Sequence, residues 1–274
     1  MTEPARTPIA VGPPKAVVGP TRRFWKLQGH GLTALAVVVA LIIWSIGAAV
    51  TSPFFFPSPL SVGNSLFDLT LNGSLPHAVA ISYFRILVGW AVGCAVAIPL
   101  ALVAGRVNLV RRLIEPFFNF FRFVPPIAFL GVAILWFGIG EGSKIAIIIY
   151  TSLFTVFMNT MAGAASVDES PSRAALCLGA SRRQVLWRVV LPATVPAILV
   201  GMRIGMGFSF MSVVAAEMIA ANEGVGFLIY NARLFLKTAN AFAGILTLGA
   251  MGLLADWLFR LLARKLFPKH ALPF

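Results

Sequence analysis

Several ionisable side chains stand inside long apolar stretches of the sequence, and three of them could act on a charged solute or on each other. Arg85 begins one stretch, and Arg203 and Glu217 lie in another. An ionised group near the centre of a membrane helix costs at least about 2.5–3.5 kcal/mol, so it usually faces a partner or a water-filled path. Arg203 and Glu217 are 14 residues apart. That is roughly 21 Å along a helix, so these two cannot pair.

Each arginine has a functional and a structural interpretation. We expect Arg85 and Glu217 to lie toward the same side of a membrane, to pair there and to hold an outer gate. If they do, reversing both charges should restore transport. We expect Arg203, near the midplane, to contact an anion in transit. A buried structural pair, or a side chain that snorkels toward water, is the alternative for each arginine.

The sequence carries no pattern typical of catalysis or metal binding. No lysine follows a glycine, which excludes a G-K-[ST] phosphate loop for ATP, and no G-x-S-x-G nucleophile turn occurs. The three histidines and two cysteines are too scattered for a metal centre or a histidine-based acid–base site. We therefore predict no catalytic residue, no metal and no cofactor bound by this chain. An intramembrane enzyme would need a catalytic cluster that the sequence does not contain.

Composition indicates an integral membrane protein. The chain is 59% hydrophobic and only 11% charged, with a mean hydropathy of +0.90, whereas soluble domains carry about 25% charged residues. A soluble enzyme, a disordered chain and a disulfide-rich secreted module are excluded. The net charge of +13 could suggest a nucleic-acid partner. In a membrane chain we interpret it instead as basic loops held against anionic lipid, with no nucleic acid bound.

Six stretches are long and apolar enough to cross a bilayer, because a membrane helix needs about 20 residues. The prediction is therefore an all-α integral membrane fold with six transmembrane helices. The expected spans are 32–50, about 84–105, 125–140, 144–165, 196–221 and 241–263.

Two Gly-x-x-x-Gly motifs, Gly89–Gly93 and Gly201–Gly205, fall inside these spans. Glycines at this spacing let helices approach closely. We expect them to serve internal packing, with a seam between two copies as the alternative.

Lysine and arginine alternate between the two sides of the predicted membrane. The loops assigned to one side, together with both ends of the chain, carry 17 basic residues, and the other side carries three. By the positive-inside rule, both termini are expected in the cytoplasm. We predict a disordered cytoplasmic tail over 1–31, a transmembrane domain over 32–265 and a cytoplasmic C-terminal tail over 266–274.

The loop at 168–192, between the fourth and fifth spans, is predicted to form two short helices around a turn. Gly179 is a natural stop because glycine adopts positive φ without strain. Ser181 and Gln184 have the spacing of a capping box, which begins the second helix. From the residues alone, the loop is either an amphipathic helix lying on the lipid or a knob that docks on a cytoplasmic partner.

This loop resembles the signature that permease subunits of ABC importers carry at the same place. The signature has two alanines, a glycine four residues on, and an ending of aliphatic-x-Leu-Pro. Arg173 stands where the signature normally has glutamate. The matching residues are Ala174, Ala175, Gly179, Val189, Leu191 and Pro192.

Further segments are similar to the taurine, alkanesulfonate and nitrate branch of that family. They are Phe56 to Pro59, Arg122 to Pro126, Trp136 to Gly140, Leu178 to Ser181, and Ala215 to Met218.

The resemblance implies a type I importer permease fold with a coupling helix between the fourth and fifth transmembrane helices. It implies a second permease copy, two ATPase subunits that bind ATP and Mg²⁺, and a periplasmic substrate-binding protein. The location would be a bacterial inner membrane, and the cargo a small anion such as taurine, another sulfonate or nitrate. The residues implied in ATPase coupling are Ala174, Ala175, Gly179, Ala180, Ser181, Leu191 and Pro192.

The alternative is a self-sufficient secondary transporter of a small solute. Such a protein usually carries more intramembrane carboxylates for ion coupling and an internal repeat. Here only Glu217 and Asp256 fall inside predicted spans, and no repeat is evident.

Overall fold

The structure is a computed structural model that describes the backbone of residues 24–268 and the side chains of residues 31–268. The described residues form helices, turns and loops, with no strand among them, which confirms the all-α prediction. Residues 1–23, most of the predicted tail, lie outside the described residues, as do residues 269–274. The first helix begins at Phe24, before the predicted end of that tail.

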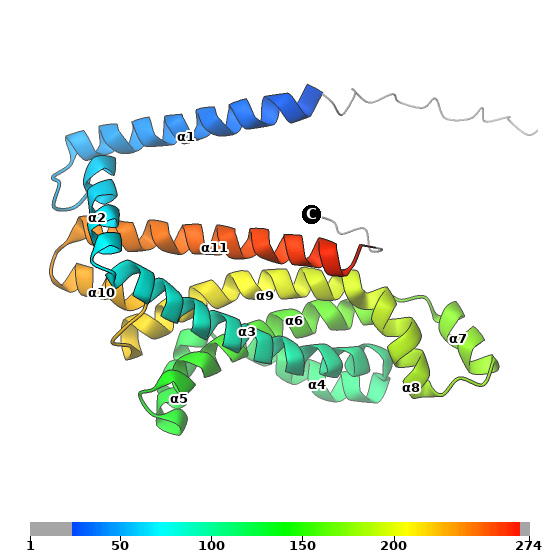
Figure 1. The fold of residues 1–274 in the computed structure, drawn as a ribbon. Coiled ribbons are helices and arrows are strands. Elements are labelled where there is room, and N and C mark those ends of the chain that lie inside the picture. Colours follow the sequence, from blue (N-terminus) through cyan, green and yellow to red (C-terminus); the bar gives the residue numbers. More distant parts are fainter. Residues whose placement is uncertain (1–23, 269–274) are drawn as a thin grey trace, which may run out of the picture. The chain divides into compact units, whose positions relative to one another are not determined.

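Figure 1 shows the order of the helices. Two short segments of other helical type interrupt the α-helices: a 3-10 turn, η1, at Pro126–Phe129, and a π-helical turn, η2, at Leu186–Val190. The α-helices are α1 (Phe24–Val50), α2 (Pro59–Leu71), α3 (Ser74–Arg106), α4 (Asn108–Phe121), α5 (Leu130–Phe137), α6 (Glu141–Ala165), α7 (Glu169–Cys177), α8 (Arg182–Val185), α9 (Leu191–Ala220), α10 (Val225–Leu234) and α11 (Thr238–Leu266).

Five described segments, in α1, α3, α6, α8 to α9, and α11, are long and apolar enough to cross a membrane. A sixth span is possible only if α4 and the stretch Pro126–Phe137 count together, and that pair is bent by 93°. The sequence predicted the third span as 125–140. The apolar helical stretch at this place begins earlier, at Asn108, and is interrupted before Pro125–Pro126, because proline disfavours helix both at its own position and at the residue before it.

The chain divides into two units, residues 1–47 and residues 48–274. The described part of the first unit is most of α1, whose apolar side chains are nearly all exposed. The second unit is a helical bundle. Helices α7 and α8 lie at one end of it, and α2 and α10 lie at the other (Figure 1). We call these the α7 end and the α10 end.

Glycines bring α3 and α9 against the central helix α6. A Cβ added to Gly89 would come 2.6 Å from Ile148, and one added to Gly93 would come 2.0 Å from the Ser152 hydroxyl. In the second motif, a Cβ added to Gly201 would come 2.8 Å from Asn159 Cβ, and one added to Gly205 would come 3.1 Å from Val156 Cγ2, both on α6. The motifs therefore serve internal packing.

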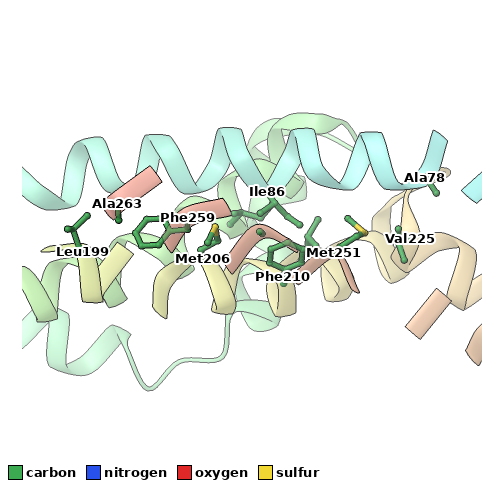
Figure 2. Packing of buried hydrophobic residues seen from close by; sticks show 12 residues of the cluster. Ala78, Ile86, Leu199, Met206, Phe210, Val225, Met251, Phe259 and Ala263 are labelled. Carbon is green, nitrogen blue, oxygen red and sulfur yellow. The ribbon is translucent and has the colours of Figure 1, made fainter. Parts of the chain in front are cut away.

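A second contact region joins α3, α9 and α11 along their length (Figure 2). Ile86, Met206 and Met251 are each 5% exposed or less and pack together there. Two hydrogen bonds tie the same helices: Tyr83 Oη donates to the Met251 carbonyl at 2.6 Å, and Trp90 Nε1 donates to the Met202 carbonyl at 2.9 Å.

Candidate functional site

The loop at 168–192 contains the predicted turn and a first short helix, α7, but the predicted second short helix is not separate. It begins at Arg182 and continues through η2 into α9. Gly179 has a φ of +87°. The capping box forms in both directions, since Ser181 N donates to Gln184 Oε1 at 2.7 Å and Gln184 N donates to Ser181 Oγ at 3.3 Å. Asp168 caps the first helix and accepts from the Ser170 backbone amide at 3.1 Å. Donation by that amide and by the Ser170 hydroxyl lowers the pKa of the Asp168 carboxyl.

The loop is anchored to the α7 end of the bundle. Arg106, at the end of α3, donates to the Val167 carbonyl at 3.0 Å and to Ser172 Oγ at 3.2 Å. Ala175 and Ala180 pack on a buried cluster made by residues of α3, α6, α8 and η2, namely Leu102, Ala164, Val185 and Val190.

Other residues of the signature face outward. Ala174 and Gly179 are exposed, and Leu178 at the tip is 89% exposed. Arg173 pairs with Glu169 on its own helix. The loop therefore combines an anchored inner side with an outward apolar tip.

Arg85 and Glu217 meet in the structure. Arg85 Nη1 donates to Glu217 Oε1 at 2.7 Å, and both side chains are fully buried. Arg85 also donates through Nε and Nη2 to both oxygens of Glu141, at 2.6 and 2.7 Å, and through Nη1 to the Glu223 carbonyl at 2.8 Å. Lys144 adds a second cation, 3.0 Å from Glu141.

Glu217 accepts further hydrogen bonds that hold it in place. Ser82 Oγ donates to it at 2.8 Å, and the Gly226 amide donates at 2.8 Å. Together these residues, which we call the Arg85 cluster, join α3, α6, α9 and α10 close to the α10 end. Glu141 was missed by sequence reasoning because it lies at the boundary of its span, where helix limits are hardest to predict.

Arg203 is separate from that cluster. Its Nε donates to Asp256 Oδ1 at 2.5 Å and its Nη2 donates to Asp256 Oδ2 at 3.1 Å. Arg260 approaches the same carboxylate at 3.0 Å. This Asp256 cluster joins α9 to α11, and its side chains are 28–38% exposed. Arg203 thus has the structural pair that was the alternative to an anion contact.

A hollow of about 550 Å³ opens beside the break between α4 and η1. Tyr150 holds the break, because its hydroxyl donates to the Phe121 carbonyl at 2.6 Å and lies 3.3 Å from the Val124 carbonyl. Arg122 lines this hollow together with Thr155 and Asn159 of α6. The predicted spans 84–105 and 125–140 leave Arg122 in the loop between them, whereas the structure places it at the 93° bend between α4 and the stretch Pro126–Phe137.

Among residues 31–268, no group of three histidine, cysteine or carboxylate side chains is arranged to hold a metal ion. The polar side chains described above form ion pairs and hydrogen bonds.

Comparisons with known proteins agree with this architecture. Residues 97–268 match the family model described as binding-protein-dependent transport system inner membrane component. The chain is 38% identical over 255 residues to the taurine transport system permease protein TauC of Escherichia coli (strain K12), covering 90% of this chain and 92% of that protein.

Two further similarities concern a sulfonate permease and a solved structure. The chain is 34% identical over 238 residues to the putative aliphatic sulfonates transport permease protein SsuC of Bacillus subtilis (strain 168), covering 86% of each. Its fold resembles a chain of the inward-facing MetNI methionine ABC transporter, with a TM-score of 0.56, 16% identity, and coverage of 67% of this chain and 93% of that one.

Proposed function

Because this chain belongs to the family of binding-protein-dependent transport system inner membrane components, we propose that it forms the translocation pathway of an ATP-driven importer for a small anion. It is a multi-pass membrane permease subunit. The proposed cargo is taurine or another sulfonate, with nitrate as the alternative. The sulfonate assignment is supported by the relatives TauC and SsuC, whose names refer to taurine and aliphatic sulfonates.

The proposed complex contains two permease copies, two cytoplasmic ATPase subunits and a periplasmic substrate-binding protein in a bacterial inner membrane. ATP and Mg²⁺ would bind to the ATPases and not to this chain. Both termini and the α7 end would face the cytoplasm, as the distribution of basic residues favours.

The proposal rests on the way the loop at 168–192 connects an exposed tip to the membrane-spanning helices. Its outward tip at Leu178 is available to a partner, while Arg106 fixes its base to α3 and the Ala175–Ala180 side packs on α6 and η2. A force applied to the tip would therefore reach three spans directly. We infer that this loop is the coupling helix, seated on the ATPase.

At the other end, the Arg85 cluster is proposed to hold the outer gate. It joins four helices through charge-assisted hydrogen bonds of the buried Arg85 and Glu217 side chains, and such hydrogen bonds are the strongest kind in proteins. Movement of α9 against α3 would have to break the Arg85–Glu217 pair, so the pair favours one arrangement of these helices.

Reconstitution tests the proposal. The permease is placed in proteoliposomes with its ATPase and binding protein, and ATP hydrolysis and taurine uptake are measured together. We expect uptake only with all components and ATP. Sustained uptake by the purified permease alone, without nucleotide, would instead establish the secondary transporter.

A single variant tests the coupling loop within the same assay. Leu178→Glu places a charge on an exposed tip, so the permease should fold normally but bind and stimulate the ATPase at least tenfold less. Cys177→Ser, the exposed neighbour, is the matched control and should behave as wild type. Unchanged ATPase binding by Leu178→Glu would contradict the docking assignment.

A further inference from the structure

Arg122 lies beside the central parts of α6 and α9, two helices that are long and apolar enough to cross a membrane. Tyr150 fixes its depth, since the tyrosine hydroxyl holds the carbonyls on both sides of Arg122, at Phe121 and Val124. Tyr150 is the tenth residue of α6, which has 25 residues. It therefore stands roughly 14 Å along a helix about 37 Å long. Ile204 and Phe208, which line the same hollow, lie in the middle of α9.

Arg122 differs from Arg85 and Arg203, which each have a carboxylate partner. Within residues 31–268, no carboxylate comes within 4.0 Å of the Arg122 guanidinium, which lies instead over the Phe123 ring with its Cζ 4.6 Å from the centroid. A cation at this depth is costly unless it faces a partner or a water-filled path.

The backbone beside Arg122 is of the kind that lines a water-filled path. The chain between Phe121 and Pro126 is not α-helical. Irregular backbone at membrane depth is tolerated where it is buried in protein or lines a water-filled cavity. Here it borders the hollow of about 550 Å³, within the range of small-molecule sites.

Helix α6 supplies polar groups at helical spacing to the lining of the hollow. Thr151, Thr155 and Asn159 follow one another at intervals of four residues on α6 and all line the hollow. Asn159 Nδ2 donates one hydrogen to the Thr155 carbonyl at 2.9 Å, which leaves its second amide hydrogen for a passing acceptor. The apolar Phe154, Ile204 and Phe208 complete the lining.

We propose that Arg122 is the contact for the anionic group of the cargo halfway across the membrane. A guanidinium presents two parallel N–H donors to an oxyanion, and a sulfonate or nitrate offers oxygen acceptors in matching positions. The inference rests on the proposed function as an anion importer and moves the anion contact from Arg203, which is paired, to Arg122.

The test uses the complete transporter in proteoliposomes. Arg122→Gln and Arg122→Lys are compared with wild type for taurine uptake over a range of concentrations, together with ATP hydrolysis in the absence of taurine. We expect Arg122→Gln to reduce uptake at least tenfold with ATP hydrolysis and complex assembly retained. Arg122→Lys, which keeps the charge, should recover a substantial part of the uptake.

A matched control separates this role from the general loss of an arginine. Arg111→Gln removes a partly exposed arginine from α4, the helix that ends just before Arg122. Arg111 pairs there with Glu115, and the variant should transport as wild type. A structural role for Arg122 would reduce assembly or thermal stability in Arg122→Gln without the recovery by lysine.

The outcomes distinguish the two proposals. If wild type imports taurine and Arg122→Gln imports it equally well, the Arg122 assignment is wrong and the proposed function stands. If the wild-type complex hydrolyses ATP but imports neither sulfonate nor nitrate, the anion cargo itself is wrong, and the Arg122 inference falls with it.

Discussion

The Arg85 cluster and the Asp256 cluster both join basic and acidic side chains across the spans, yet they are built differently. Arg85 and Glu217 are fully buried and connect four helices. Arg203, Asp256 and Arg260 are about one third exposed and connect two helices. Water can solvate a charge whose partner is removed at an exposed site, but not at a buried one. Removing one member of an ion pair should therefore cost much more stability in the Arg85 cluster than in the Asp256 cluster.

The largest effect is expected from breaking the buried pair. Arg85→Leu leaves the Glu217 carboxylate buried with only neutral donors around it. We expect a loss of stability of about 3–5 kcal/mol, typical of removing one partner of a buried ion pair. The measurement is thermal unfolding of the purified permease in detergent. Retention of the wild-type unfolding temperature would show that the cluster is not held as described.

The double charge reversal that the sequence suggests is now expected to fail. With Arg85→Glu and Glu217→Arg together, the new glutamate would face Glu141, and the new arginine would meet the Gly226 N–H donor. Transport should therefore stay lost, although the two reversed charges could attract each other. Recovery of taurine uptake in the double variant would mean that Glu141 and Gly226 contribute little.

The sequence could predict the Arg85–Glu217 pair but not the other residues that contact it. Both residues stand close to the same predicted membrane boundary, and this shared depth was the useful signal. Arg203 and Asp256 carried the same signal. Arg203 lies 12 residues after the start of α9, and Asp256 lies 10 residues before the end of the antiparallel α11. Matching depths between helices would have suggested their pairing.

The loop at 168–192 was predictable because its signals are local. A capping box and a glycine stop depend only on residues a few positions apart. The end of one helix just before Gly179 and the start of the next after Ser181 therefore follow from the sequence. Helix α4 was not predictable by hydropathy, because Arg111, Arg112 and Glu115 interrupt its apolar pattern. The depth of Arg122 depends on that helix and on the long-range Tyr150 contact.

A backbone variant tests the buried cluster without removing a charge. Gly224 has a φ of +113°, and a Cβ there would come 2.4 Å from Glu217 Cδ. Gly224→Ala should therefore strain the backbone and displace the carboxylate, with a loss of roughly 1–3 kcal/mol. Gly249→Ala on α11, where the added Cβ would meet open space, is the control. Equal unfolding temperatures for the two variants would argue against tight packing at Glu217.

The exposed cluster should tolerate the loss of its acid. Asp256→Asn keeps the shape and hydrogen-bonding capacity of the side chain while removing its charge. Because the pair is about one third exposed, we expect a loss of about 1 kcal/mol or less. The unfolding temperature of Asp256→Asn is compared with that of Glu217→Gln. A larger drop for Asp256→Asn would reverse the ranking of the two clusters.

Asp168 caps the first helix of the loop at 168–192 and is exposed. Compared with the charged groups of the Arg85 and Asp256 clusters, we expect its charge to contribute least to stability. Donation by Ser170 lowers the pKa of this carboxyl, so the charged form is favoured in the folded loop. The stabilisation is present above the unfolded pKa of about 3.9 and is lost as the pH falls through the lower folded pKa. At neutral pH, Asp168→Ala should therefore speed amide hydrogen exchange at the start of α7. Asp168→Asn, which retains an accepting oxygen, should keep the protection and lose its dependence on acid. Identical exchange in Asp168→Ala and wild type would show that the cap contributes nothing to the stability of the loop.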